Sequence, residues 1–204
     1  MRLSRSGWEV EAETVKLGIL ADIHCNAPAL DTALALLEAE EVDELIVAGD
    51  AIYQYRFSAP VVRRLRDCGA RFILGNHEEA YLASLNGDKE LPDADLICWL
   101  RAQPLSIEIE ADGRKLLAFH ATPWEPRNEY LMPNHPRIAE FSQLGYDVVI
   151  YGHTHWQLAE FFGPTLVVNP GSVGEPRDHR NGMRGSVAVL DTASLEVTHH
   201  DFDV

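Results

Sequence analysis

The sequence predicts an α/β fold in which two packed sheets carry helices on their outer faces, within a single domain. Apolar strand-like segments alternate with helical segments over the first third of the chain, as they do in βαβ units. Short strands then follow one another, and an Asp112-Gly113 pair between two of them is typical of a hairpin turn. The chain has 204 residues, 46% of them apolar, which is enough to bury the core of one such domain.

The first three predicted strands are separated by two helices. The helix at 28–40 has Pro28 in its first turn and leucines at helical spacing, and the helix at 58–68 has Ser58 as its N-cap. This alternation implies right-handed crossovers and a sheet that starts with parallel strands. The predicted strands are 15–21, 44–48 and 70–74.

The rest of the chain adds antiparallel strands and further helices. The predicted helices are 77–85, 93–102 and 136–144. The predicted strands are 105–110, 115–120, 147–151, 157–162, 165–169, 185–190 and 195–202. We expect residues 15–204 to form the domain, and residues 1–14 to be a loose tail or an extra edge strand.

Charge and apolar runs exclude several classes of protein. Lys and Arg total 17 and Asp and Glu total 32, so the formal net charge is −15. Such a surface repels long nucleic acids, and a phosphate-bearing partner is expected to be small. No apolar run approaches the roughly 18–20 residues that span a bilayer, and the N-terminal segment lacks the apolar core of a secretory signal.

The three cysteines, Cys25, Cys68 and Cys98, are scattered without a CxxC pair. An odd count at wide spacing argues against a disulfide framework and suits a reducing compartment. We therefore expect a cytoplasmic protein, with Cys68 and Cys98 as small buried side chains.

Polar residues follow the C-terminal ends of five predicted strands. Ligands of α/β sheets bind at that edge, so these side chains are expected to converge. Each signal alone fits a capped loop, a turn or a structural histidine. The joint pattern favours a metal site, and the pair in Gly-His-Thr-His points one way if its backbone is extended. The set comprises Asp22, His24, Asp50, Asn76, His77, His120, His153 and His155.

The remaining histidines, His135, His179, His199 and His200, are expected at the solvated surface.

Carboxylate, imidazole and amide ligands indicate catalytic rather than structural metal binding. Without a cysteine cluster, a closed zinc site is not expected, whereas Mn²⁺, Fe, Co²⁺ or catalytic Zn²⁺ suits these ligands. Seven candidate ligands are too many for one ion that keeps an open position. They suit two ions about 3.5–4 Å apart that share a carboxylate. We expect two divalent ions, Mn²⁺ first, with Fe, Zn²⁺, Co²⁺ or Ni²⁺ as alternatives.

The strand-end motifs, taken in order, resemble those of the calcineurin-like metallophosphoesterase superfamily over about residues 16–191. The segment Asn-Pro-Gly-Ser at 169–172 resembles the small bacterial and archaeal phosphodiesterase branch. The resemblance implies a four-layer α-β-β-α sandwich. The motifs are Asp22-x-His24, Gly49-Asp50, Gly75-Asn76-His77, His120 and Gly152-His153-x-His155.

The resemblance also implies a role for each strand-end residue. Asp50 would bridge the two metals. His77 would not be a ligand, and would hold a phosphoryl oxygen or protonate the leaving group beside the scissile ester. The first metal would be bound by Asp22, His24 and His155, and the second by Asn76, His120 and His153.

The implied activity is hydrolysis of phosphodiester or phosphomonoester bonds of a small substrate through a metal-bridging hydroxide. One alternative is a protein Ser/Thr phosphatase or dinucleoside polyphosphate hydrolase of the same superfamily, although these relatives generally have longer chains. Another is a non-catalytic scaffold like the family member of the retromer complex, which predicts eroded ligands or a missing His77 equivalent. By analogy, the protein is expected to be a dimer or tetramer.

Residues near the motifs are further candidates. Arg177 is expected to bind the substrate by clamping a phosphate, whereas Arg180 and Arg184 are explained at least as well as surface charges. The loop at 121–135 is long and aromatic enough to be a lid or substrate wall. Tyr53 and Tyr55 either line the substrate cleft or pack against the next helix. Cys25 stands where the related branch has Gly, as a tolerated small side chain or as an oxidation-sensitive thiol.

Overall fold

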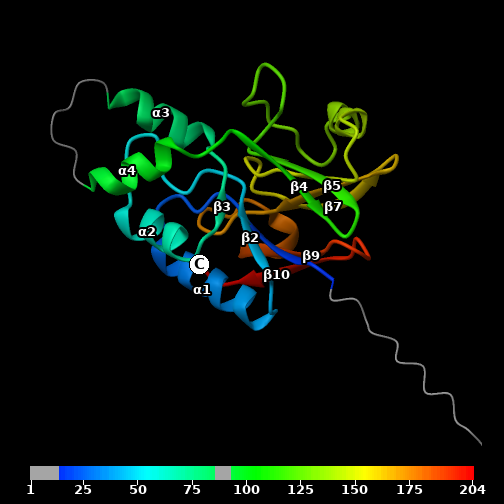
Figure 1. The fold of residues 1–204 in the computed structure, drawn as a ribbon, viewed down its shortest axis with the longest axis horizontal. Coiled ribbons are helices and arrows are strands. Elements are labelled where there is room, and N and C mark those ends of the chain that lie inside the picture. Colours follow the sequence, from blue (N-terminus) through cyan, green and yellow to red (C-terminus); the bar gives the residue numbers. More distant parts are fainter. Residues whose placement is uncertain (1–13, 86–92) are drawn as a thin grey trace, which may run out of the picture.

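Two mixed five-stranded sheets form the centre of the fold in the computed structural model, which describes residues 14–85 and 93–204 (Figure 1). The prediction for the first fourteen residues falls almost wholly outside these ranges. The first sheet has the order β10-β9-β1-β2-β3, with strands Val197–Phe202, Gly185–Asp191, Lys16–Leu20, Glu44–Val47 and Arg71–Phe72. The second has the order β4-β5-β6-β8-β7, with strands Ser106–Ala111, Arg114–Phe119, Val148–Ile150, Thr165–Pro170 and Gln157–Phe162.

The five predicted helices lie within one residue of their predicted bounds, and a sixth, short 3₁₀ helix was not predicted. They are α1 Ala27–Ala39, α2 Ala59–Asp67, α3 Asn76–Ser84, α4 Ala94–Arg101 and the 3₁₀ helices η1 Pro136–Gln143 and η2 His179–Asn181. Asn26 caps α1, because its side-chain oxygen accepts a hydrogen bond from the Ala29 N–H at 3.2 Å. Ser58 precedes α2 as predicted, but its side chain makes no capping hydrogen bond.

Each sheet contains three parallel strands, which run from the centre to one edge of the first sheet and form the middle of the second. β1, β2 and β3 are parallel, as the alternation of strands and helices predicts, and β5, β6 and β8 are parallel in the second sheet. β4 and β5 form the predicted hairpin, in which Asp112 and Gly113 both have left-handed backbone, with φ of 48° and 73°. The carboxyl ends of several strands therefore meet at one edge of the molecule.

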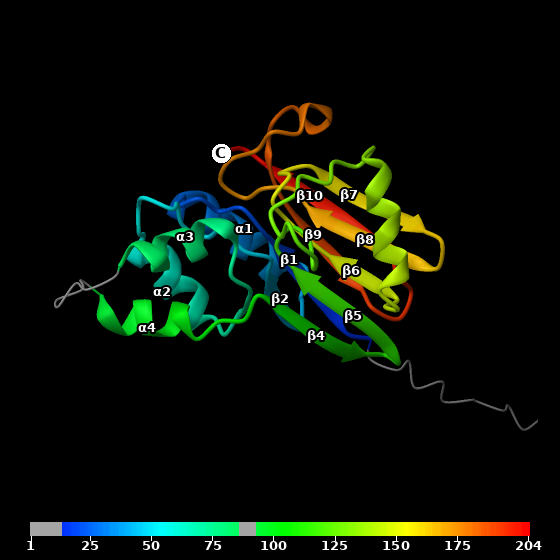
Figure 2. The same cartoon turned by 90° about the horizontal axis from the view of Figure 1, so that it is seen from above.

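Three buried apolar clusters separate four layers. One lies between α1, α2, α4 and the first sheet, one between the two sheets, and one on the outer face of the second sheet under η1. Figure 2 shows helices α1 to α4 on one side and the yellow-green coil of η1 on the other. The predicted four-layer α-β-β-α sandwich is thus confirmed, except that its outermost helix is a 3₁₀ helix.

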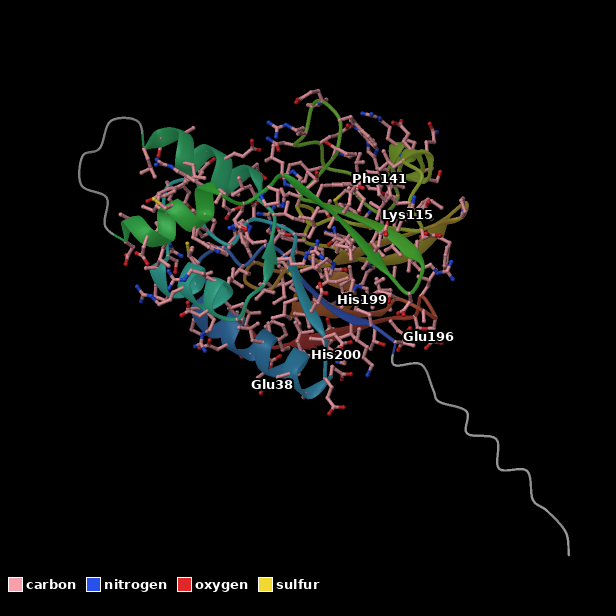
Figure 3. All side chains as sticks on the ribbon, viewed as in Figure 1. Glu38, Lys115, Phe141, Glu196, His199 and His200 are labelled. Atoms are coloured by element: carbon pink, nitrogen blue, oxygen red, sulfur yellow. The ribbon has the colours of Figure 1, made fainter. Side chains whose placement is uncertain are left out.

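Four predictions about the burial of side chains are wrong. Cys68 and Cys98 are exposed rather than buried. His199 and His200 are half-buried on opposite faces of β10, because helices cover one face of this sheet and the second sheet covers the other. His199 Nε2 lies 2.9 Å from the Asn169 carbonyl oxygen, and His200 Nε2 lies 3.4 Å from Glu40, directly after α1. Both histidines are labelled in Figure 3.

Among the described residues, no helix has the length and apolar character needed to cross a membrane.

A substitution at Phe141 tests whether η1 covers a buried apolar core. It is fully buried on η1, and its ring lies 5.3 Å from that of Phe119 and 5.5 Å from that of Tyr151. Phe141→Ala should lower the free energy of unfolding by about 3–5 kcal/mol, because it leaves a cavity under η1. The control Phe161→Ala removes a half-exposed ring from β7 and should change it by about 0.5 kcal/mol or less in urea denaturation. Equal losses would mean that η1 does not close a core.

Candidate metal centre

All eight predicted strand-end residues lie together at the edge where the carboxyl ends of β1, β2, β3, β5 and β6 meet. A hydrogen bond connects the two sheets at this edge. His120, directly after β5, donates from its ring Nδ1 to the carbonyl oxygen of Ala48, directly after β2, at 2.7 Å. The residues divide into clusters whose ligand atoms lie within 4.8 Å of one another. The clusters are Asp22, His24 and His155; Asp50, His120 and His153; and His24, Asp50 and His77.

In the first cluster, two imidazoles face one carboxylate. Asp22 Oδ1 lies 3.3 Å from His155 Nε2 and 3.8 Å from His24 Nε2, and the two nitrogens are 3.2 Å apart. All three side chains are almost completely buried. Three ligand atoms thus surround one point at the end of β1.

The second cluster centres on His120. Its Nε2 lies 3.2 Å from Asp50 Oδ2, 3.1 Å from His153 Nδ1 and 3.0 Å from Asn76 Oδ1. Asp50 also belongs to a cluster with His24 and therefore lies between the two sets. His153 and His155 fall into different sets, which is the division that the family resemblance implies.

The loops that present these side chains have an unusual backbone. Several of these residues have a left-handed backbone, which costs about 1–3 kcal/mol for each residue. Contacts with the surrounding residues must stabilise this conformation. The prediction that His153 and His155 lie on extended backbone is wrong. The φ values are 55° at Asp22, 48° at His24, 56° at Asp50, 65° at His153 and 59° at His155.

Backbone carbonyls set the tautomers of two imidazoles. The Nδ1–H of His120 donates to the Ala48 carbonyl, and the Nδ1–H of His155 donates to the Glu175 carbonyl. In the neutral ring, each Nε2 therefore keeps its lone pair directed at the cluster. Both histidines are oriented as metal ligands by groups outside the cluster.

Glu78 is a residue of this site that the sequence did not reveal. Its carboxylate is fully buried and accepts hydrogen bonds from the backbone N–H groups of Asp50, Ile52 and Gly75 at 2.8–2.9 Å. Burial, and after it the nearby Asp50 carboxylate, raises the pKa of Glu78 to about 7, although the backbone hydrogen bonds act to lower it. The only sequence signal is its place directly after Gly-Asn-His.

The Asn-Pro-Gly-Ser segment, which begins in the last residues of β8, forms hydrogen bonds that hold the loops of the centre. Asn169 Nδ2 donates to the Gly152 carbonyl at 2.8 Å and to Thr154 Oγ1 at 3.1 Å. Ser172 Oγ donates to the Asp22 carbonyl at 2.8 Å. These bonds explain how the left-handed turns on both sheets are maintained.

Most protonation states of the centre suit metal binding at neutral pH. Burial lowers the pKa of His24 and of His153 to about 4, so both are neutral. Burial opposes ionisation of the two carboxyl groups, but His155 keeps the pKa of Asp22 low and His120 does the same for Asp50. Burial alone would lower the pKa of His120, yet Asp50 raises it to about 10, so a cation would replace a proton there.

The residues present fit two divalent cations. Asp22 Oδ1 is buried and has no hydrogen-bond partner, and a charged oxygen in that state is costly unless a cation contacts it. The donors are carboxylate, imidazole and amide groups without thiolate, which suits hydrolytic metals. Asp50 groups with His120 and His153 and also with His24 of the first cluster, and two adjacent ligand sets joined by one carboxylate are the arrangement of a binuclear site.

Two predicted neighbours of the centre have different surroundings. Arg177 Nη2 forms an ion pair with Glu175 Oε2 at 3.0 Å and is about half exposed, so its role as a phosphate clamp stays a prediction. Glu175 Oε2 lies 3.6 Å from His24 Nε2. Cys25 has a φ of 62°, a backbone region that favours glycine, and its thiol contacts the Arg56 carbonyl.

Comparisons with known proteins agree with this geometry. Residues 15–195 match the calcineurin-like phosphoesterase superfamily domain, and the chain belongs to that superfamily. Phosphodiesterase MJ0936 of Methanocaldococcus jannaschii is 26% identical over 192 residues, which cover 89% of this chain and 96% of that protein. Phosphodiesterase YfcE of Escherichia coli K12 is 27% identical over 191 residues, which cover 90% and 91%.

A crystal structure of a metallophosphoesterase from Sphaerobacter thermophilus has the same fold, with a TM-score of 0.76 and 22% identity over 94% of this chain and 89% of that chain. The resemblance in the strand-end motifs, including its small archaeal and bacterial branch, is confirmed by these matches.

Glu78→Gln tests the support of the centre. An amide cannot accept from all three N–H groups, so one buried donor loses its partner at a cost of about 1–3 kcal/mol. We expect a lower thermal midpoint and weaker Mn²⁺ binding in calorimetry, because the loop carrying Asp50 loosens. Glu79→Gln on the next, more exposed position is the matched control and should leave Mn²⁺ affinity unchanged. Unchanged affinity in Glu78→Gln would show that the loop is positioned without this carboxylate.

Proposed function

We propose that this chain is a binuclear metal-dependent phosphodiesterase that hydrolyses a small diester. The observation that carries the proposal is the position of the Asp50 carboxylate, which groups with His120 and His153 and also with His24 of the other buried ligand set. Membership of the phosphoesterase superfamily and the names of the two relatives support it. Two divalent cations, Mn²⁺ first with Fe, Zn²⁺, Co²⁺ or Ni²⁺ as alternatives, would activate water and offset phosphoryl charge.

His77 supplies the proton chemistry in this proposal. Its Nδ1 accepts a hydrogen bond from the Gln54 N–H at 3.0 Å, so the proton of the neutral ring lies on Nε2. Nε2 lies 3.7 Å from Asp50 Oδ2, and the side chain is 22% exposed. An N–H donor at the open side of the shared carboxylate can hold a phosphoryl oxygen or donate its proton to the leaving group.

The charge around the centre favours a diester over a monoester. Glu175 adds a carboxylate beside His24, and its partner Arg177 is already neutralised by that ion pair. A phosphodiester carries one negative charge, whereas a phosphomonoester gains a second charge at its second ionisation, which has a pKa of about 6. The Glu175 carboxylate would repel this second charge, so we propose small diesters as the substrates. Arg177 would contact the phosphate after its ion pair with Glu175 opens.

A complete ligand set with His77 favours catalysis over a scaffold role, because a scaffold has no need of buried, unpaired ligand atoms.

Asp50→Ala is expected to abolish metal binding at both clusters. Wild-type protein purified without chelator should hold about two metal ions per chain and hydrolyse bis(p-nitrophenyl) phosphate with added Mn²⁺. The variant should lose both ions, since the shared carboxylate contacts both sets, and should lose turnover with them. Asp203→Ala, at an exposed carboxylate near the C-terminus, is the control. A wild-type protein without metal or turnover would favour the scaffold alternative.

His77→Ala separates proton chemistry from metal binding. We expect metal content to stay at the wild-type level while kcat falls roughly 100- to 10,000-fold, which is the usual contribution of a positioned acid or base. The measurement is kcat and KM for bis(p-nitrophenyl) phosphate beside metal analysis of the same sample. Full activity in this variant would remove His77 from the mechanism.

A further inference from the structure

The hollow beside Asn76 and His120, on one side of the candidate metal centre, has a volume of only about 20 Å³, too little to enclose an ester arm. An arm of a bound diester that lies on this side must therefore run along the surface. Exposed side chains that stack on the candidate ligands, directly or through another ring, are the groups that can hold the arms of the diester.

A stack of aromatic rings leads from the first cluster to the surface. The Tyr53 ring lies over His24, with centroids 4.7 Å apart and planes at 30°. The Tyr55 ring lies over Tyr53 at 5.2 Å and 11°, and is 74% exposed. Of the two interpretations of Tyr55, this exposure excludes packing against the next helix, and the ring is free to stack on a ligand.

The turn that carries these tyrosines is held in place. Tyr53 and Arg56 exchange two backbone hydrogen bonds of 3.2 Å, and the Gln54 N–H donates to His77 Nδ1. The Arg56 guanidinium lies 5.3 Å from the Tyr53 ring centroid. A ring fixed in this way loses little conformational freedom when a flat group stacks on it.

A second exposed ring borders the other cluster. Tyr130, in the loop at 121–135, stacks on His153 with centroids 3.9 Å apart and planes at 29°. It is 53% exposed. Few large apolar side chains of the described residues are as exposed as these two. Tyr55 reaches His24 of the first cluster through the Tyr53 ring, and Tyr130 stacks directly on His153 of the second.

We propose that Tyr55 and Tyr130 are stacking surfaces for two aromatic arms of the substrate, one on each side of the scissile phosphate. The substrate class is then a diester with a nucleobase or similar flat ring on each arm, as in a dinucleotide. This inference rests on the proposed phosphodiesterase function and names its substrate. Stacking on tyrosine accepts any base, because every base has a π face.

His77 sets which arm leaves. Its ring centroid lies 5.7 Å from that of Tyr53 and 5.0 Å from that of His24. The leaving group that receives its proton therefore lies on the Tyr55 side. The retained arm lies on Tyr130.

Kinetics with two esters test the assignment. Bis(p-nitrophenyl) phosphate has a ring on each arm, whereas methyl p-nitrophenyl phosphate has a ring only on the leaving arm. Tyr55→Ala should lower kcat/KM for both esters about 5- to 100-fold, the loss from removing one stacked base. Tyr130→Ala should lower it by that factor for the two-ring ester alone. Tyr55→Phe and Tyr130→Phe keep the ring and should recover most of the kcat/KM that the matching alanine variant loses, whereas the distant Phe161→Ala should remain within about twofold of wild type.

Metal content in every variant shows whether a loss is structural. If either alanine variant loses metal, or if Tyr130→Ala slows both esters equally, the ring supports a ligand histidine and the proposal is overturned. Unchanged kinetics in both alanine variants with wild-type turnover intact would reject the stacking surfaces and leave the proposed function standing.

Binding provides a readout independent of turnover. Calorimetry with a dinucleoside phosphorothioate, a slowly hydrolysed diester, should show the dissociation constant rising about 5- to 100-fold in each alanine variant. Wild-type protein that binds it and hydrolyses no ester would contradict the proposed function but support the stacking surfaces. Wild-type protein that binds it no better than dimethyl phosphate would contradict the surfaces.

Discussion

The carboxylate of Asp50 lies where the two sheets meet, and the rest of the centre is arranged around it. It follows β2 of the first sheet and contacts His120 of the second at 3.2 Å. Gly75 passes so close that an added Cβ would lie 2.2 Å from Asp50 Oδ1, and Glu78 binds the Asp50 N–H. A buried charge shared by two sheets needs both positive partners and a rigid backbone, and the surrounding residues supply each of these.

The cost of this arrangement is spread over the fold. Five candidate ligands have left-handed backbone, and two ionised carboxylates are buried near each other. Hydrogen bonds from Asn169 and Ser172 hold the loops, and carbonyl oxygens orient His120 and His155. The unpaired oxygen of Asp22 is what these bonds leave uncompensated. A cation is the one partner that satisfies the carboxylate and the imidazole lone pairs together.

The sequence predicted the strands and the polar residues at their ends, because a buried parallel strand is nearly continuous in apolar residues and its end is marked by Gly, Asp or His. It could not predict the turn conformation at His153 and His155, since that depends on Asn169 from β8. The burial of Glu78 was equally hidden, because it depends on N–H groups from another loop. Tyr130 stacks on a ligand 23 residues along the chain, a contact that no local pattern encodes.

Anomalous diffraction from crystals grown with Mn²⁺ tests the central claim most directly. We expect two anomalous peaks about 3.5–4 Å apart, with Asp50 between them. His155 should contact one ion together with Asp22 and His24, and His153 the other together with Asn76 and His120. A single peak, or His153 and His155 bound to the same ion, would contradict the binuclear arrangement.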